Sequence, residues 1–443
     1  MVTTGRSMFR RSWFLFCALL AGCGGGGASG KPTSPGTLGP TIYYNTDSVV
    51  PSTGESGSDS AVVDSYASTL LKNWDIPGAA IAVAKDGKLI FAKGYGYADF
   101  ESKQLVQPDS MFRIADVSKV LTGVAVLHLV DEGLLRLDQK WLEILPEYVP
   151  PNNGDARTQD ITVRHLLQHS GGWNALRSGD PYDHLDQIAS ETGNSPALCS
   201  DIIDVLIKRP LDFSPGQEFR YSDFGYCILG RIVERVTGQS YEHYVRDHVL
   251  AAMDVNGMSI GYSHANQRGP YEVKYYPFGG ETPVASVFPG EGNVPSPYAR
   301  ELLASDAADG WVGSTIDITR VMTSIEGTRG ERFLSTTSMN ELIANPSLEG
   351  WNTPDYWYGL GITIGPTPQT WYHEGSVAGS VSFVYRSPNH YVVAILTNSR
   401  PANLQTFIPS LRATAETIAS GLKGSGSDLY PAFVSPAVPP RTK

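Results

Sequence analysis

The sequence predicts an α/β (α+β) fold, in which one antiparallel sheet is built from both chain ends, is flanked by helices, and carries an inserted, mostly helical lobe. Two observations lead to this prediction. Two apolar runs, residues 78–84 and 88–94, enclose the turn Lys-Asp-Gly-Lys at 85–88, which is a hairpin signal. Near the other end, strand-like runs precede a last helical segment. Strands at both ends, with helical patterns between them, indicate one sheet that both ends share.

Each element follows from a local pattern. Apolar residues at helical spacing predict a helix over 61–74, before the hairpin. A second helix is expected over 116–132, because apolar residues recur there at the helical period and Gly133 follows as a helix end. The remaining expected elements are helices at 162–169 and 224–237, strands at 371–372, 381–386 and 391–398, and a helix within 404–422.

The composition restricts the class of protein. The 443 residues suffice for two packed lobes, and 41% hydrophobic with 18% charged residues is typical of soluble globular proteins. Beyond the N-terminal region, no stretch of the sequence is long and apolar enough to predict a membrane span. The formal net charge of −11 argues against nucleic acid as a partner.

The N-terminus is typical of a segment removed during export. Arginines at positions 6, 10 and 11 precede a short apolar stretch at 13–20, and Leu-Ala-Gly-Cys at 20–23 resembles the lipobox of bacterial lipoproteins. This resemblance implies that Cys23 is lipidated and anchors the mature protein to a membrane. It places the protein at the outer membrane, the cell surface or the periplasm. An ordinary signal peptide, or a short anchor with a chance cysteine, is the alternative.

The expected organisation is therefore a signal peptide, a tether, one domain and a tail. The tether, rich in Gly, Ser and Pro, and the tail, of similar composition, are expected to be disordered. The expected boundaries are 1–22 for the signal, 23–60 for the tether, 61–423 for the domain and 424–443 for the tail. Within the domain, residues of about 61–115 and 300–423 form the sheet lobe, and about 116–299 form the helical lobe. Cys199 and Cys227 either pair in the exported protein or stay as two buried thiols.

Three segments carry a resemblance to a known family. Residues 111–133 resemble the nucleophile helix of the serine β-lactamase and penicillin-binding protein superfamily. Residues 161–172 and 214–230 are similar to segments of its class C β-lactamase-related branch, which includes D,D-peptidases, D-aminopeptidases and family VIII esterases. The resemblance runs from about 61 to 399 and implies a β-lactamase/transpeptidase-like fold with a cleft between the two lobes.

The first family motif is altered in this chain. The motif is Ser-x-x-Lys, with the serine at a helix start and the lysine one turn later. Lys119 is present, but Asp116 occupies the serine position. Ser118 lies about 200° around a helix from Asp116, and is therefore not expected to replace the serine. One further Ser-x-x-Lys, at 420–423, borders the tail and is interpreted as chance.

The other two motifs also carry acids. The second, Tyr-x-Asn, has its counterpart from Tyr221 to Asp223, and the third, a His- or Lys-containing triplet that ends in Gly, is His373, Glu374 and Gly375. In such enzymes the serine forms an acyl-enzyme, the lysine and tyrosine transfer protons, and backbone amides hold the oxyanion. The resemblance thus implies that Asp116, Lys119 and Tyr221 hold the catalytic positions. It also implies that Asp223, His373, Glu374 and Gly375 bind the ligand.

Asp116 has three interpretations. It can be a helix N-cap, which the helix dipole and Lys119 would stabilise as a carboxylate. It can be catalytic itself, as nucleophile or base, or it can bind a ligand or cation. A carboxylate held in this way is a poor nucleophile and places negative charge where an oxyanion must form.

Two functional hypotheses follow. The first is a catalytically impaired serine-hydrolase homologue that binds a cell-envelope peptide, glycopeptide or protein in the cleft. The alternative is an active esterase, peptidase or β-lactamase with altered chemistry around Asp116, Lys119 and Tyr221. No cofactor is expected, and no His/Cys cluster has the spacing of a metal site. The other histidines, including His165 and His169, are expected to be structural.

Overall fold

The computed structural model of the protein describes residues 49–56, 60–150, 154–350, 353, 355–423, 426–434 and 441. Its centre is an antiparallel sheet in the order β1-β3-β2-β16-β15-β14-β13-β12, with β4 paired to β3. These strands are β1 (Ser52–Ser56), β2 (Gly78–Lys85), β3 (Lys88–Asp99), β4 (Gln104–Leu105), β12 (Trp357–Tyr358), β13 (Thr363–Ile364), β14 (Trp371–Val377), β15 (Ser380–Arg386) and β16 (Tyr391–Thr397).

The two chain ends meet in the middle of this sheet. Strands β2 and β16 pair in antiparallel register, from Ala79 opposite Thr397 to Lys85 opposite Tyr391. The hairpin β2–β3 and the strand β16 were expected near these positions, and the sheet built from both ends is confirmed. Strands β12 and β13 are short additions at the far edge that the sequence patterns did not predict.

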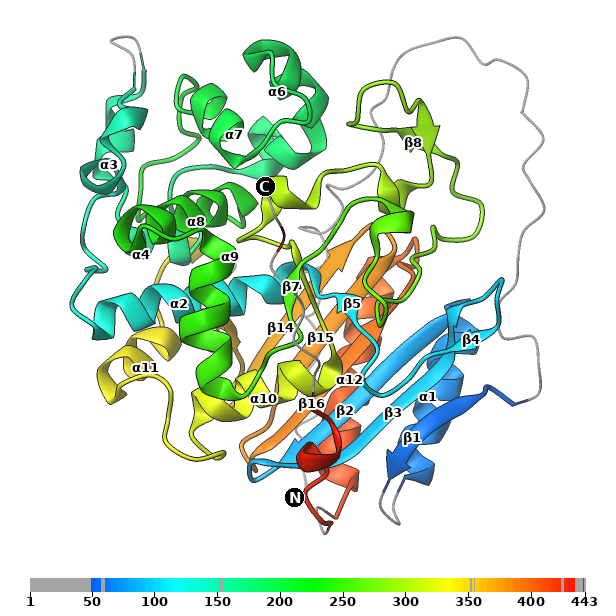
Figure 1. The fold of residues 1–443 in the computed structure, drawn as a ribbon. Helices are drawn as coiled ribbons and strands as arrows, with labels where there is room; N and C mark the ends of the chain where they lie inside the picture. Colours follow the sequence, from blue (N-terminus) through cyan, green and yellow to red (C-terminus); the bar gives the residue numbers. More distant parts are fainter. Residues whose placement is uncertain are drawn as a thin grey trace, which may run out of the picture.

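Helices cover both faces of the sheet. Helices α1 (Ala61–Asn73) and α12 (Leu404–Gly421) pack on one face, and α10 (Thr315–Glu326) packs on the other (Figure 1). The alternation of strand side chains divides the core accordingly. Ile81 and Val83 of β2 join the cluster under α1 and α12, whereas Ala80 and Ala82 join the cluster on the α10 side.

The inserted lobe is mostly helical and lies beside the sheet (Figure 1). Its longest helices are α2 (Ser118–Asp131) and α8 (Asp223–Thr237), which pack against each other, and α4 (Val163–Leu167) packs on α8. Its other α-helices are α3 (Trp141–Ile144), α5 (Ala175–Ser178), α6 (Leu185–Thr192), α7 (Cys199–Leu206) and α9 (Tyr241–Tyr244), and α11 (Thr336–Ile343) packs on α2 from beyond the insertion.

A small second sheet lies before the start of α2. Its strands β5 (Phe112–Arg113), β10 (Trp311–Gly313) and β7 (Ser259–Ile260) pair in the order β5-β10-β7. Two further short pairs are β8 (Val284–Ala285) with β9 (Asn293–Val294) and β6 (Glu218–Phe219) with β11 (Glu349–Gly350). The strand β10 leads directly into α10, so this sheet connects the covering helix to the segment that precedes Asp116.

Two predictions of disorder are wrong where the structure describes the chain. Part of the expected tether forms β1, which pairs with β3 from Ser52 opposite Tyr95 onward. Part of the expected tail is bound to the domain, because the backbone N–H of Leu429 donates to the carbonyl of Leu89 and Tyr430 is 2% exposed. The expected signal peptide and Cys23 lie outside the described residues.

The sequence left two alternatives for Cys199 and Cys227, a disulfide or two buried thiols, and the structure contains the disulfide. Cys199 at the start of α7 is bonded to Cys227 in α8, and both residues are buried. The bond joins two helices of the inserted lobe. Among the helices that the structure describes, none has the length and apolar character of a membrane span.

Candidate functional site

Asp116 lies at the junction between the small sheet and α2. It is the middle residue of a 3₁₀ helix, η3 (Ala115–Val117), which runs directly into α2. Ala115 has a φ of +46°, an uncommon conformation for a residue other than glycine and a sign of local strain. The expected N-cap role is wrong, because the residue that caps α2 is Val117 and it makes no side-chain cap hydrogen bond.

The carboxylate of Asp116 instead accepts hydrogen bonds from three separate parts of the chain. Its Oδ1 accepts from Lys119 Nζ at 2.7 Å and from the Tyr221 hydroxyl at 2.6 Å. Its Oδ2 accepts from the backbone N–H of Ser376 in β14 at 2.9 Å. One side chain therefore ties together α2, the segment before α8 and a central strand.

Lys119 is fully buried and is surrounded by acceptors. Its Nζ lies 2.6 Å from Asp223 Oδ1, in addition to its bond with Asp116, and donates to the carbonyl of Ala308 at 3.0 Å. It also lies 5.0 Å from the centre of the Tyr221 ring. The structure thus brings together Asp116, Lys119, Tyr221 and Asp223, as the three-motif resemblance implies.

The electrostatics of this cluster follow from two carboxylates that share one buried ammonium. Burial works to raise the pKa of Asp116, but Lys119, with the donors Tyr221 and Ser376, lowers it to about 2. Burial works to lower the pKa of Lys119, but Asp116 and Asp223 raise it above its ordinary value. Burial raises the pKa of Asp223 to about 6, because the attraction of Lys119 is opposed by Asp116.

The third motif lies on β14, next to Asp116. His373 is buried, and its ring nitrogens contact the carbonyl of Glu374 at 2.7 Å through Nδ1 and the Tyr358 hydroxyl at 3.1 Å through Nε2. Burial lowers the pKa of His373 to about 4, so the ring is neutral at pH 7. A Cβ on Gly375 would lie 2.6 Å from the backbone nitrogen of Asp116, so this approach of two backbones requires glycine.

Glu374, the middle residue of the third motif, is a half-buried acid on the same strand. Burial raises its pKa to about 8, and Asp116 adds to the rise, while Arg412 opposes it. Its Oε1 atom is shielded from solvent and has no hydrogen-bond partner. The side chain is therefore protonated over much of the neutral range, and carries less negative charge than the sequence suggests.

Several residues of the site escaped the sequence analysis. His169, expected to be structural, stacks on Tyr221 with ring centres 4.3 Å apart, and its Nδ1 accepts from the N–H of Ser222 at 3.1 Å. These contacts hold the Tyr221 segment in place. The Ser376 N–H and the Tyr358 hydroxyl gave no sequence signal, because one is a backbone group and the other lies outside any motif.

Ser118 does not share the site with Asp116. It is fully buried, and its Oγ accepts from the backbone N–H of Trp311 at 3.3 Å, on the side of the small sheet. Within the described part of the chain, no group of three or more His, Cys, Asp or Glu side chains is arranged to hold a metal ion.

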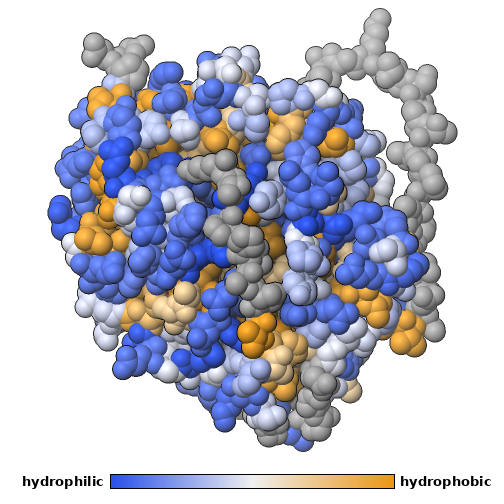
Figure 2. Space-filling model, viewed as in Figure 1, coloured by the Kyte–Doolittle hydropathy of each residue, from blue (hydrophilic) through white to orange (hydrophobic). Residues whose placement is uncertain are grey.

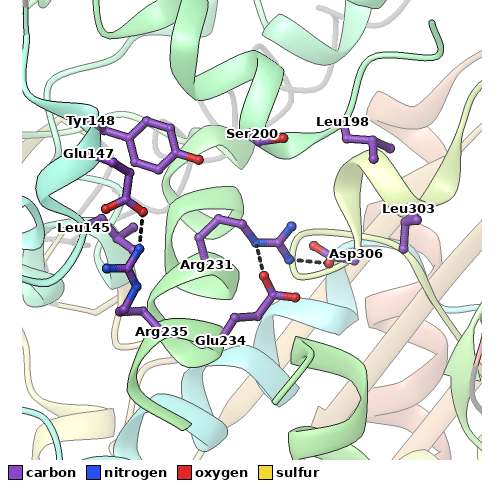
Figure 3. A pocket seen from close by; sticks show the side chains of 10 residues that line it. All are labelled: Leu145, Glu147, Tyr148, Leu198, Ser200, Arg231, Glu234, Arg235, Leu303 and Asp306. Atoms are coloured by element: carbon purple, nitrogen blue, oxygen red, sulfur yellow. Dashed lines mark hydrogen bonds and ion pairs between the residues drawn. The ribbon is translucent and has the colours of Figure 1, made fainter. Parts of the chain in front are cut away.

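A separate pocket of about 380 Å³ opens elsewhere in the inserted lobe (Figure 3). Its charged walls are already paired, because Arg231 contacts Glu234 and Asp306, and Arg235 contacts Glu147. None of the motif residues lines this pocket. We therefore place the candidate site at the convergence of the motifs, where the chemically informative groups lie, and not at this pocket.

Comparisons with known proteins identify the family and the fold. Residues 63–411 match the family described as Beta-lactamase. Protein flp of Staphylococcus aureus (strain MW2) is 29% identical over 329 residues, which are 74% of this chain and 61% of that protein. A fimbrial assembly protein described as probable FimD, from Dichelobacter nodosus, is 30% identical over 46% of this chain and 48% of its own. The chain thus spans about three fifths or less of these curated relatives.

Solved structures share the fold at low sequence identity. A penicillin-binding protein homologue from Pyrococcus abyssi, an octamer, has a TM-score of 0.62 at 24% identity, over 82% of this chain and 78% of its own. EstCE1, a hydrolase with promiscuous acyltransferase activity, has a TM-score of 0.64 at 20% identity, over 80% and 97%. A D-amino acid amidase from Ochrobactrum anthropi SV3 has a TM-score of 0.62 at 20% identity, over 81% and 99%.

Proposed function

Because the chain belongs to the β-lactamase family, we propose that it is a catalytically impaired member, which binds a peptide, glycopeptide or protein of the cell envelope between its two lobes. The Asp116 carboxylate carries this proposal. Acyl transfer in a serine enzyme needs a hydroxyl nucleophile, a group that accepts its proton, and donors that hold the oxyanion. Each of these three requirements is unmet around residue 116.

The oxyanion donor is already occupied. The Ser376 N–H points at the side chain of residue 116, and is the type of backbone donor that would hold the oxyanion formed there. Here it donates to Asp116 Oδ2. A substrate carbonyl would have to displace a carboxylate oxygen, and the remaining negative charge would oppose the developing oxyanion.

The two proton-transfer groups are held in their protonated forms. The pKa of Lys119 is raised above its ordinary value by Asp116 and Asp223, despite burial. Burial raises the pKa of Tyr221, and the charge of Asp116 raises it further, so the phenol stays a donor. Neither group is suited to accept a proton from a nucleophile. A pKa of about 2 makes Asp116 itself a weak base and a poor nucleophile.

The test is to restore the hydroxyl at position 116. We expect Asp116→Ser to gain weak hydrolysis of an activated short-chain ester and to be labelled by a fluorophosphonate, because it restores an attacking atom and removes the blocking charge. The natural protein is expected to show neither reaction, and no labelling by a fluorescent penicillin. Asp223→Asn, added to Asp116→Ser, should increase the gain, since it lowers the pKa of Lys119.

The matched control is Asp116→Asn, which removes the charge without supplying a nucleophile and should stay unlabelled. The Asp116→Ser change should cost about 1 to 3 kcal/mol of stability, since it loses charged hydrogen bonds but leaves Lys119 paired with Asp223. Ester hydrolysis by the natural protein that Asp116→Asn abolishes would make Asp116 catalytic and the proposal wrong. If folded Asp116→Ser is also inert, the site has lost more than its nucleophile.

A further inference from the structure

The candidate site continues beyond Lys119 into a second group of polar side chains. Asp309 is 3% exposed, and its Oδ2 accepts from Arg300 at 2.9 Å, but its Oδ1 has no hydrogen-bond partner. Tyr182 is 8% exposed, its ring lies 5.4 Å from the Arg300 guanidinium carbon, and its hydroxyl also has no partner. Both atoms are buried and have no hydrogen-bond partner in the protein, so each can accept a hydrogen bond from a ligand.

Both groups belong to the surroundings of Asp223. Lys119 Nζ lies 2.6 Å from Asp223 Oδ1 and donates to the carbonyl of Ala308, the residue before Asp309, at 3.0 Å. Burial raises the pKa of the Tyr182 hydroxyl well above its ordinary value, and the charges of Asp223 and Asp309 add to the rise. Asp180 completes the group, since its Oδ1 accepts from the N–H of Tyr182 at 2.9 Å. These four residues come from the start of α8, the segment before β10, and η6 (Pro181–His184) with its cap.

Negative charge exceeds positive charge in this group. Among the residues that the structure describes, Asp116 and Asp223 pair with Lys119, Asp309 pairs with Arg300, and Asp180 adds a fourth acid. Burial and the charge of Asp223 raise the pKa of Asp180 well above its ordinary value. A buried surplus of carboxylates is stabilised either by protons or by a cation from outside.

A small opening lies beside this group, at Asp180. A pocket of about 40 Å³ is lined by Asp180, Pro181 and Trp173, and by Ser222 and Phe224, the residues on either side of Asp223. One water molecule occupies roughly 30 Å³ in the liquid, so the pocket has room for one group of that size. An ammonium group has this size and the charge that the acids require.

We propose that Asp223, Asp309 and Tyr182 form a subsite that binds the protonated primary amine of the ligand. The two carboxylates supply charge-assisted acceptors, and the hydroxyl supplies a third acceptor. The remainder of the ligand extends from Lys119 toward β14. This inference rests on the proposed function, since it specifies what the same cleft recognises.

The experiment compares two probes that differ only in this charge. Calorimetry at about pH 6.5, where an α-amine is protonated, measures the affinity of the protein for phenylalaninamide and for N-acetylphenylalaninamide, each as the D and L form. We expect the free amine of at least one enantiomer to bind about tenfold tighter than its acetylated form or better, because acetylation removes the charge and a donor.

Three variants locate the subsite. Asp223→Asn and Asp309→Asn should each reduce the preference for the amine several-fold, and Tyr182→Phe should reduce it less, since it removes a neutral acceptor. The matched control is Asp247→Asn, an exposed acid of the same lobe, which should leave the preference unchanged. Thermal melts confirm that each variant is folded, and Tyr182→Phe keeps the test valid if an acid proves essential for folding.

The outcomes separate the two proposals. Equal binding of both probes, no binding of either at millimolar concentration, or equal effects of Asp309→Asn and Asp247→Asn would overturn the amine subsite. Mass spectrometry of the recovered probe tests the other proposal. Hydrolysis of the amide by the natural protein would overturn catalytic impairment, and a retained preference for the amine would still support the subsite.

Discussion

At the scale of single residues, the carboxylate of Asp116 accepts more hydrogen bonds than the hydroxyl of a serine could accept at the same position. Its two oxygens satisfy Lys119 and Tyr221 on one side and the Ser376 N–H on the other. A serine has one oxygen and reaches only part of this set. The same contacts that stabilise the carboxylate hold Lys119 and Tyr221 protonated, so the catalytic impairment that we propose would have the same physical cause as the stability of this cluster.

Glu374 gives a residue-scale prediction about pH. Its pKa is raised to about 8, first by burial and then by Asp116, from an ordinary value near 4.5. Between these values the folded state holds a proton that the unfolded state has released, so this group makes stability fall as pH rises. We expect Glu374→Gln to be more stable than the natural protein at pH 8.5, on the order of 4 kcal/mol, and equal to it near pH 4.

Chemical denaturation across this pH range measures the difference. Glu349→Gln, at an exposed position in β11, is the control and should not change the slope of stability against pH. A Glu374→Gln variant whose stability runs parallel to that of the natural protein at every pH would mean that Glu374 is ionised in the fold.

At the scale of elements, the segment after α12 is part of the domain. Leu89 in β3 donates to Asp428 and accepts from Leu429, so this segment pairs with the start of a central strand. Tyr430 then inserts beside α10, where its hydroxyl donates to Thr319 at 3.1 Å and Arg320 donates to its carbonyl at 3.0 Å. The segment thereby links the sheet to the helix that covers it.

This packing predicts that Tyr430 contributes to the stability of the domain. Tyr430→Ala leaves a large buried cavity against α10, and we expect a loss of about 3 kcal/mol in the free energy of unfolding. Val434→Ala, four residues further and 80% exposed, is the matched control and should change stability by less than about 0.5 kcal/mol. Similar unfolding midpoints for the two variants in urea would show that the segment does not contribute to the core.

At the scale of the whole molecule, we consider the surface and the net charge. The face shown in Figure 2 is mainly hydrophilic, with hydrophobic side chains in small separate patches. With a net charge of −11, the chain is poorly suited to anionic partners such as nucleic acid. The Leu-Ala-Gly-Cys sequence at 20–23, which resembles a lipobox, is the basis of a proposal about a membrane anchor.

We propose that the mature protein begins at a lipidated Cys23. Cys23→Ala should then leave an unprocessed or unlipidated precursor, because the thiol is the acceptor of the lipid. Cell fractionation with mass spectrometry of the mature N-terminus provides the measurement, and a Cys17→Ala variant is the control that should be processed normally. Because position 24 is Gly rather than Asp, a host with two membranes is expected to send the protein to the outer one. A mature terminus elsewhere, without an acyl mass, would contradict this proposal.

The sequence by itself determined the local elements and the identity of the motifs. Helical periodicity predicted α2 and α8 almost to the residue, since a helix buries one face through contacts only three or four positions apart. The turn at 85–88 predicted the β2–β3 hairpin, because a hairpin also joins residues that are close together in the sequence. The motifs indicated Asp116, Lys119, Tyr221 and Asp223 as one site, because a resemblance in sequence carries the spatial arrangement of the family with it.

Only the tertiary structure decided what these residues do to one another. One interpretation of the sequence made Asp116 the N-cap of α2, yet its carboxylate accepts a hydrogen bond from Ser376, 260 positions away, because β14 brings a backbone N–H against it. Local sequence patterns also do not indicate three other features of the structure. These are the buried polar atoms of Asp309 and Tyr182 without partners, the Cys199–Cys227 disulfide, and the burial of Tyr430. Contacts between distant segments depend on strand register and helix packing, and pKa values depend on the burial that results, so neither can be derived from residue spacing alone.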